Sequence, residues 1–365
     1  MALKLPNQKL LYFILIILLG CRKSAPVFHL PGPSNPSDNI YLTGHLDSQY
    51  QRNLKYWVKG GSWEIGQCGW YTSEASTTGI AVQGNDIFIS GFMPLTFSST
   101  AVLNYVACYW KNGTRNFLGD TSRQSYASGI ALSGNDVYIS GYYDGGSAVY
   151  WKNGQENVLP DKGFGAQANA ISVSGSDVYV VGTIGMDSFF RKTLVGLWKN
   201  GSLNIIGDSS QGAFGTCMAI ANSDIYIGGM VGYNGNVDAI YTLFRATYWK
   251  NGIAVDLSQS GEFSQISALA VSGGNVYAAG FSTANYARIA LFWENGNREN
   301  LPGEAGNLDS YTTSIALVGN DVYIGGATMY QNNAGIDHVA TYWKNGTANY
   351  LNNGDAINAL CGPSH

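Results

Sequence analysis

The pentapeptide Tyr-Trp-Lys-Asn-Gly at residues 109–113 decides the fold of this chain. The same five letters or a close variant return at 56–60 (YWVKG), 150–154, 197–201 (LWKNG), 248–252, 292–296 (FWENG) and 342–346. The tryptophan of this motif therefore recurs at intervals of 41 to 53 residues. Self-similarity at such a period is the signature of repeat architectures such as propellers and solenoids.

A second repeated element keeps step with the pentapeptide. Its copies are GIAVQGNDIFISG (79–91), GIALSGNDVYISG (129–141), AISVSGSDVYVVG (170–182), AIANSDIYIGG (219–229), ALAVSGGNVYAAG (268–280) and SIALVGNDVYIGG (314–326). Each half alternates apolar with small or polar residues, which predicts a strand, and the central turn predicts a hairpin. The Asn-Gly of the pentapeptide predicts a type I′ turn into a fourth strand.

Four short antiparallel strands in about 48 residues form a propeller blade. The chain ends carry complementary half-units, because DNIYLTG (38–44) is a second strand without a first and NALCG (358–362) is a first strand without a second. We therefore predict an all-β, seven-bladed β-propeller of four-stranded antiparallel blades, closed by pairing of the N- and C-terminal strands (3+1). A solenoid is the alternative, and it would need capping repeats.

The repeat resembles the kelch family, in which an apolar strand ends in a glycine pair and a Tyr and a Trp follow at intervals; the pair is kept here at Gly228-Gly229 and Gly325-Gly326. It is also similar to the HAF-type extracellular repeats of bacteria, with their Leu-Trp-Lys-Asn-Gly pattern. The resemblance covers about residues 38–362. It implies a propeller architecture and specifies neither a ligand nor a reaction.

The N-terminus predicts export with a lipid anchor. An apolar run from Leu10 to Gly20 is too short for a membrane-spanning helix of about 20 residues and suits a signal peptide. It ends in Leu-Leu-Gly-Cys, which resembles the lipobox of bacterial lipoproteins and implies lipidation of Cys21. An ordinary secretory peptide is the alternative. We expect a lipoprotein signal peptide at 1–20, the lipidated cysteine and a flexible Pro/Ser-rich tether at 21–37, and the propeller at 38–365.

The same resemblance implies a location in the cell envelope. Arg22 follows the lipidated cysteine, where an Asp favours retention in the inner membrane, so the outer membrane is expected. No acidic run follows Cys21, which favours the periplasmic side over the cell surface. We expect a monomer that touches the membrane through its lipid alone.

Composition excludes one class of partner. Charged residues make up 12% of the chain, the net charge is -4 and the pI is about 5.5, so there is no basic field for nucleic acid. Export permits disulfides, but the spacing of the remaining cysteines ranks none of their pairings. Burial as small apolar side chains is the alternative for Cys68, Cys108, Cys217 and Cys361.

The repeat also predicts which face of the ring is functional. The turns between strands 1 and 2 and between strands 3 and 4 are nearly identical in every blade, whereas the connections on the opposite face vary. We expect any ligand on this variable face, around the mouth of the central channel. Six of the seven connections between blades carry an aromatic residue: Trp70 or Tyr71, Tyr126, Phe164, Phe214, Phe263 and Tyr311.

These rings have two interpretations. They could stack on a sugar or hold a protein partner, or they could pack between blades and close the core. Phenylalanine favours packing. The predicted ligand-binding residues are therefore Trp70, Tyr71, Tyr126 and Tyr311.

The sequence contains few residues suited to catalysis or to metal binding. His45 and His338, with Asp47 or Asp337, are the one combination that could approach a metal, and we predict no metal and no cofactor. The turn acids are expected to bond backbone donors of their hairpins instead of calcium: Asp86, Asp136, Asp177, Asp224 and Asp321. Three arginines precede the Trp strands at unequal offsets and are expected in salt bridges: Arg191, Arg245 and Arg288.

Three functions stay open at the level of sequence. The first is a non-enzymatic, lipid-anchored propeller that binds a glycan or protein partner through its variable face. The second is a carbohydrate-active hydrolase or lyase on the same scaffold, which would need two carboxylates about 5–9 Å apart. Candidate acids in suitable loops are Glu74, Asp144, Asp238, Glu262 and Asp309. The third is an assembly scaffold.

Overall fold

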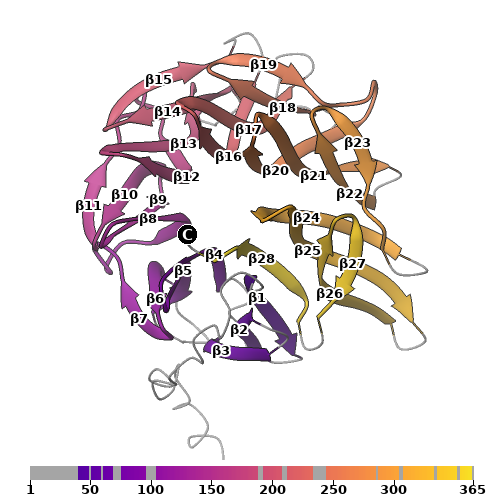
Figure 1. Ribbon diagram of the computed structural model, residues 1–365. Coiled ribbons are helices and arrows are strands. Elements are labelled where there is room, and N and C mark those ends of the chain that lie inside the picture. The colour runs from indigo at the N-terminus through magenta and orange to yellow at the C-terminus, as the bar shows by residue number, and fades with distance from the viewer. Residues whose placement is uncertain are drawn as a thin grey trace, which may run out of the picture.

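The protein folds into a ring of seven four-stranded antiparallel sheets around a common axis (Figure 1). This computed structural model describes residues 40–48, 51–58, 61–68, 75–95, 104–187, 192–207, 212–232, 244–284, 287–303, 307–332, 335–351 and 354–363. Over these ranges, no helix has the length and apolar character needed to cross a membrane. The predicted all-β, seven-bladed propeller is confirmed.

The blades are named A to G in chain order. Blade A contains β28 (Ala356–Cys361), β1 (Tyr41–Ser48), β2 (Gln51–Val58) and β3 (Gly61–Cys68), and blade B contains β4 (Ser76–Gln83), β5 (Asp86–Pro94), β6 (Tyr105–Lys111) and β7 (Thr114–Phe117). Blade C contains β8 (Ser125–Ser133), β9 (Asp136–Tyr143), β10 (Ser147–Lys152) and β11 (Gln155–Val158), and blade D contains β12 (Ala166–Ser174), β13 (Asp177–Gly185), β14 (Thr193–Lys199) and β15 (Ser202–Ile206). Blade E contains β16 (Ala213–Ala221), β17 (Asp224–Gly232), β18 (Phe244–Lys250) and β19 (Ile253–Asp256). Blade F contains β20 (Phe263–Ser272), β21 (Asn275–Ala284), β22 (Ala287–Glu294) and β23 (Asn297–Asn300), and blade G contains β24 (Asn307–Val318), β25 (Asp321–Asn332), β26 (Gly335–Lys344) and β27 (Thr347–Tyr350).

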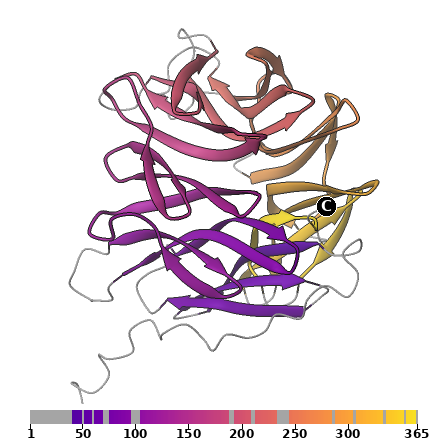
Figure 2. The same ribbon diagram turned by 60° about the vertical axis from the view of Figure 1, so that its left-hand side comes forward.

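The first strand of each blade lies nearest the axis and the fourth lies at the rim (Figure 1). Figure 2 shows the same strands running between the two faces of the ring. We call the face with the short hairpins the turn face and the face with the variable connections the loop face.

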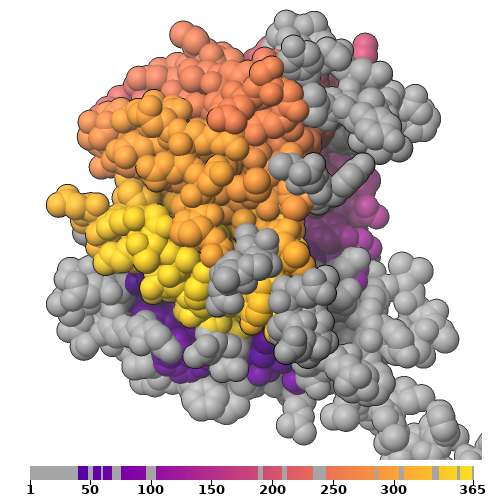
Figure 3. Space-filling model, turned by 90° about the vertical axis from the view of Figure 1, so that its right-hand side faces the viewer, coloured from indigo at the N-terminus to yellow at the C-terminus, as the bar shows by residue number. Residues whose placement is uncertain are grey.

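Blade A is built from both ends of the chain. The C-terminal strand β28 pairs antiparallel with β1, in a register that joins Tyr41 to Cys361 and His45 to Ala356. Figure 3 shows the yellow C-terminal strands directly against the indigo N-terminal ones. The predicted 3+1 closure is therefore present, and it leaves the ring without an unpaired end face.

Every blade carries a β-bulge on its innermost strand. The register with the second strand shifts by one residue at the same place in each sheet. The extra residue is always polar: Thr78, Ser128, Asn169, Thr216, Ser267, Thr313 and Asn358. A bulge of this kind bends the strand and increases its twist.

The bulge explains the glycine that ends each second-strand motif. In blade C, a Cβ on Gly141 would collide with the backbone oxygen of Tyr126, two residues before the bulge. The same collision with a backbone oxygen would occur at Gly44, Gly91, Gly182, Gly229, Gly280 and Gly326. The repeated glycine is therefore required by sterics in all seven blades.

The bulged side chains also link neighbouring blades around the axis. Thr216 Oγ1 of blade E donates to the backbone oxygen of Ile266 in blade F at 2.7 Å. Equivalent bonds run from Asn169 to Gly215 O (2.7 Å), from Thr313 to Ile357 O (2.8 Å) and from Asn358 to Thr77 Oγ1 (3.2 Å). These hydrogen bonds satisfy polar groups next to the axis and join the innermost strands of neighbouring blades.

The motif tryptophans fill the space between blades. All seven are at most 2% exposed: Trp57, Trp110, Trp151, Trp198, Trp249, Trp293 and Trp343. Trp151 packs in a cluster with Leu118 of blade B, whereas its neighbour Tyr150 packs against the cluster that contains Trp198 of blade D. Adjacent residues on one strand thus contact opposite neighbours, as period 2 requires.

The Asn-Gly hairpins are type I′ turns, as predicted. In six blades the asparagine has φ of 48–51° and the glycine φ of 79–86°, so both central residues lie in the left-handed region. The turn aspartates differ from prediction, because their carboxylates bind side chains and not backbone donors. In blade C, Asp136 pairs with Lys152 Nζ at 2.8 Å and accepts from Asn153 Nδ2 at 2.7 Å.

We call this arrangement the Asp–Lys–Asn network. It recurs with the aspartate at positions 86, 177, 224 and 321, with Asp–Lys distances of 2.7–2.8 Å. Each lysine also lies over an aromatic ring, as Lys152 does over Tyr138 at 5.2 Å. Blade F is the exception, since Asn275 and Glu294 replace the aspartate and the lysine. In blades B, C, D, E and G the turn face therefore presents charges that are already paired.

Among the described residues, three cysteines form no disulfide bond. Cys108 is fully buried, and burial of the thiol raises the pKa of Cys217 and of Cys361 to about 12. The side chain of Cys68 lies outside the described part of the structure. These three thiols fit the interpretation as small apolar side chains instead of the disulfide one.

Candidate functional site

Two of the four predicted ligand-binding residues lie in the described ranges. Tyr126 and Tyr311 occupy equivalent positions on the innermost strands β8 and β24, two residues before the bulge, at the loop face. Trp70 and Tyr71 lie outside the residues that the structure describes. The structure therefore describes only part of the predicted set of aromatic residues around the channel mouth.

Tyr126 packs between blades B and C. Its ring centroid lies 5.0 Å from that of Phe92, 6.1 Å from that of Tyr105 and 5.2 Å from that of Tyr142. The Tyr126 hydroxyl accepts a hydrogen bond from Gln124 Nε2. These four rings form the B–C aromatic group, in which Tyr126 is half-buried. Tyr126 thus packs against rings of both blades and is still partly exposed.

A second set of rings, the E–F aromatic group, lies further round the loop face. Phe244 lies between Phe214 and Phe263, with centroid distances of 5.6 and 5.9 Å, and Phe281 continues the stack at 6.1 Å from Phe263. Phe164, by contrast, is 45% exposed. The aromatic residues thus gather in groups and are not spaced evenly.

The ring of Tyr311 contacts a cation. The guanidinium carbon of Arg288 lies 4.1 Å from the centre of the Tyr311 ring, a cation–π geometry. Arg288 also binds Asp309 in a forked pair, with Nη2–Oδ2 at 2.6 Å and Nε–Oδ1 at 3.1 Å. Burial raises the pKa of Tyr311 above its ordinary value. Arg288 is accordingly in a salt bridge, as predicted, and so is Arg245.

A cluster of ionisable side chains lies beside Tyr311, where the chain closes into blade A. We call it the closing-blade cluster: His45, Asp47, Arg52, His338 and Asp355. Arg52 binds Asp47 through both carboxylate oxygens at 2.6 Å, and the backbone N–H of Asp47 donates to Asp355 Oδ2 at 2.6 Å. His338 is exposed at the edge of the cluster.

Within the cluster, the pKa values of His45, Asp47 and Asp355 are shifted in different directions. Burial, and then the charge of Arg52, lowers the pKa of His45 to about 4, so this imidazole is neutral near pH 7. Burial raises the pKa of Asp355. Burial would also raise the pKa of Asp47, but hydrogen bonds and charge from Arg52 outweigh it and hold that pKa below its ordinary value.

The two histidines approach each other, as the sequence suggested, without forming a metal site. Across the described ranges, no three His, Cys, Asp or Glu side chains are arranged to hold a metal ion. His45 Nδ1 is buried and lacks a hydrogen-bond partner among the residues described. A neutral ring tolerates that position better than a charged one does.

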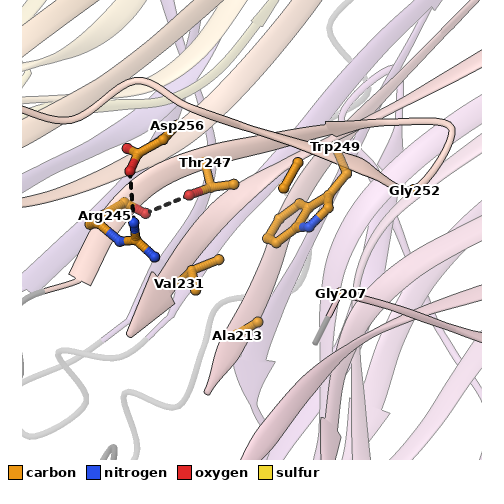
Figure 4. Close-up of a pocket in the computed structure, with 9 residues that line it drawn as sticks. Gly207, Ala213, Val231, Arg245, Thr247, Trp249, Gly252 and Asp256 are labelled. Carbon is orange, nitrogen blue, oxygen red and sulfur yellow. Dashed lines mark hydrogen bonds and ion pairs between the residues drawn. The ribbon is translucent and has the colours of Figure 1, made fainter. Parts of the chain in front are cut away.

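A slot of ligand size is lined by residues from all four strands of blade E and by Gly207 at the end of blade D. Its cavity volume is about 450 Å³. The lining residues, most of them labelled in Figure 4, are Gly207, Ala213, Val231, Arg245, Thr247, Trp249, Gly252, Ala254 and Asp256. Arg245 Nη1 binds Asp256 Oδ2 at 3.0 Å, at the loop-face ends of β18 and β19 (Figure 4).

The residue opposite the tryptophan is small in blade E, as it is in blade G, where Ala348 pairs with Trp343. Ala254 pairs with Trp249 across β18 and β19. In four other blades, a larger residue lies opposite the tryptophan: Arg115, Glu156, Leu203 and Arg298. In blade E, the methyl group of Ala254 and the absent side chain of Gly207 line the slot together with Trp249.

Sequence reasoning missed both the slot and the closing-blade cluster as a unit. Aligning the pentapeptides shows alanine five positions after the motif Trp in blades E and G, so this sequence signal does not by itself single out the slot. Asp355 has no comparable signal, because it joins the cluster only when the two ends of the chain meet.

Compared with known proteins, the chain matches no protein-family model, and no curated protein resembles it significantly in sequence.

Proposed function

We propose that the protein is an exported, lipid-anchored β-propeller of the bacterial cell envelope, which binds a glycan or a protein partner through its loop face. The difference between the faces carries this proposal. The turn face repeats one charge-paired network in five blades, whereas the loop face has different aromatic and charged groups in each sector. Binding residues usually lie on variable connections that a rigid scaffold holds in place.

We place the first contact with a ligand in the blade-E slot, at the end where Arg245 and Asp256 bring it to the loop face. Its volume of about 450 Å³ is typical of a site for a small molecule or one sugar unit. Trp249, Ala213 and Val231 supply apolar walls, while the Thr247 hydroxyl and the Arg245–Asp256 pair supply polar groups. A sugar ring presents apolar C–H faces and hydroxyl groups together, so a glycan is the ligand class to test first.

The anchor is supported by the N-terminal sequence. Lipidation of Cys21 would hold the propeller at the outer membrane, on its periplasmic side, through the tether at 22–37. Metabolic labelling with a fatty-acid analogue tests the anchor: the wild-type chain should be labelled and Cys21→Ser should not.

Binding is tested on residues 38–365 with a glycan array. Ala254→Leu fills the slot from an exposed strand position, and Ala348→Leu makes the same change at the equivalent position of blade G. We expect the first variant to lose at least tenfold in affinity and the second to bind as wild type. If no glycan binds, capture of one stoichiometric protein partner identifies the ligand as a protein. Failure of both assays contradicts the proposal.

A hydrolase or lyase is the second candidate, and one observation favours it. Asp47 and Asp355 are adjacent, and their surroundings move their pKa values in opposite directions. Such a pair suits a division into general acid and base. Turnover of a bound glycan, abolished by Asp355→Asn without loss of binding, would establish this activity. Binding without turnover in the wild-type protein would exclude it.

A further inference from the structure

The hairpins of the turn face contain a chemically reactive pair of residues. Six described blades place Asn-Gly at the tip of the turn: 112–113, 153–154, 200–201, 251–252, 295–296 and 345–346. Asparagine before glycine deamidates readily, because glycine has no side chain to hinder its backbone nitrogen. A protein exported to the envelope keeps these sites for its whole lifetime, so their protection matters.

The reaction needs the asparagine side chain to turn toward its own backbone. The nitrogen of the glycine attacks Cγ of the asparagine, forming the N–Cγ bond of a succinimide. The Cγ–Nδ2 bond breaks, and ammonia leaves with the proton that the glycine nitrogen loses. Water then opens the ring on either side, giving aspartate or isoaspartate. The net change is one water consumed, one ammonia released and one negative charge gained.

The Asp–Lys–Asn network holds the side chain away from this path. In blade C, Asn153 Oδ1 accepts from the backbone N–H of Val137 at 2.9 Å, and Asn153 Nδ2 donates to Asp136 Oδ1 at 2.7 Å. A carboxylate only accepts hydrogen bonds, so it fixes which end of the amide faces it. Attack by Gly154 N requires rotation of the side chain and the loss of both bonds. The bond to the carboxylate is the stronger, because it is charge-assisted.

Blade F lacks the aspartate and the lysine of the Asp–Lys–Asn network, which act as a charged clamp on the asparagine in the other five blades. Asn295 Nδ2 donates to the neutral oxygen of Asn275 at 3.0 Å, whereas the five bonds to aspartate measure 2.7–2.8 Å. Glu294 occupies the lysine position, so no ion pair holds the acceptor in place. The bond from Val276 N to Asn295 Oδ1 remains, at 2.9 Å. Asn295 is exposed to water.

We propose that Asn295-Gly296 is the deamidation site among these six hairpins, and that the Asp–Lys–Asn network protects the other five. Conversion of Asn295 to a carboxylate would remove the donor to Asn275 and add a negative charge beside Glu294. The modification would therefore act on one blade and leave the charge pairs of the other five intact.

Peptide mapping by mass spectrometry tests the proposal on the folded chain. The protein is incubated in mildly alkaline buffer, and deamidation is followed at all six hairpins. We expect Asn295 to react at least several-fold faster than Asn153 or Asn345. In urea the six rates should converge, because unfolding removes the clamps and leaves the shared Asn-Gly sequence. Similar rates at all six hairpins in the folded protein would overturn the proposal.

Two variants exchange the environments of blades C and F. Asp136→Asn gives blade C the neutral acceptor of blade F, and we expect it to accelerate deamidation of Asn153 while Asn345 is unaffected. The double variant Asn275→Asp, Glu294→Lys gives blade F the charged clamp and should slow Asn295 to the rate of the others. Should Asp136→Asn fail to fold, the double variant decides alone. An unchanged rate at Asn295 in the double variant would refute the protective role.

Discussion

On the turn face, Asp136 binds Lys152 and Asn153, and four other blades repeat those contacts at nearly the same distances. On the loop face, Tyr126 packs against three rings, whereas the equivalent Tyr311 packs under Arg288. The same backbone position therefore has different contacts from blade to blade on the loop face, whereas on the turn face blade F alone departs from the pattern among the six blades whose turns are described. That difference is what separates the scaffold of this propeller from its recognition surface.

The comparison also predicts how substitutions behave. A change in the shared scaffold should have a similar effect in every blade, because the local contacts are the same. A change on the loop face should have an effect that depends on the blade. The four predictions below test this contrast, and they run from the largest expected effect to the smallest.

The largest effect is expected at the glycines opposite the bulges. Gly141→Ala would place a Cβ against the backbone oxygen of Tyr126, and no side-chain movement can relieve a clash with backbone. We expect a loss of at least about 4 kcal/mol in the free energy of unfolding, measured by urea denaturation. Gly163→Ala, on the connection to blade D, is the control. Its Cβ would meet open space, so the only cost is the strain of an alanine at a positive φ of 88°, about 1–2 kcal/mol. Equal losses in the two variants would contradict the steric argument.

The motif tryptophans come next. Trp151 is fully buried between blades B and C, so Trp151→Ala should lower the free energy of unfolding by about 3–5 kcal/mol. Phe164→Ala removes a loop-face ring that is 45% exposed, and we expect a change within about 0.5 kcal/mol. Calorimetry on both variants measures the contrast. A stable Trp151→Ala protein would mean that the repeated aromatic residues do not form the core.

The motif tryptophans and the bulges differ in how well the sequence predicted them. The Trp interval, the Asn-Gly turns and the half-units at the chain ends sufficed for the blade count and the closure, because each depends on local geometry that repeats. The bulge was not predicted, although a polar residue precedes the repeated aliphatic segment in every blade. Its cause is the fit between two strands, which period-2 alternation alone does not contain.

The candidate site was predictable only in outline. The loop face and the positions of Tyr126 and Tyr311 followed from topology, but their partners come from connections of unrelated sequence. Arg288 lies one blade before Tyr311, and Asp355 meets Asp47 only through ring closure. The pairing of the turn aspartates with Lys and Asn side chains was also missed, because it joins two different hairpins of one blade.

The third prediction concerns the pH range over which a loop-face residue contributes to the free energy of unfolding. On the loop face, the pKa of His45 is about 4 in the folded protein against an ordinary value of 6.5, so the unfolded chain binds a proton more readily. The associated stability is complete above pH 6.5 and is lost as the pH falls toward 4. The loss should be on the order of 3 kcal/mol.

Thermal denaturation across this pH range measures the effect, and His45→Gln is the informative variant. Glutamine carries no titratable group, so the variant should keep nearly constant stability between pH 6.5 and 4. The groups that face His45 are Arg52, Asp47 and His338, so Lys55→Gln, outside this set, serves as a control. A wild-type profile that is flat over this range would show that His45 is not held neutral by its surroundings.

The smallest effect is expected on the turn face, in a lower range of pH. Hydrogen bonds from Lys152 and then from Asn153 lower the pKa of Asp136 in the folded protein. Its contribution to stability is therefore present above the ordinary aspartate pKa of 3.8 and is lost as the pH falls through the lower folded value. Asp136→Asn should lower the melting temperature slightly at neutral pH and not at all in strong acid. Because the pair is exposed, high salt should reduce the difference. Asp144→Asn, a loop-face change in the same blade, should match wild type, and a deficit of Asp136→Asn that persisted in acid would show that packing and not charge holds the turn face together.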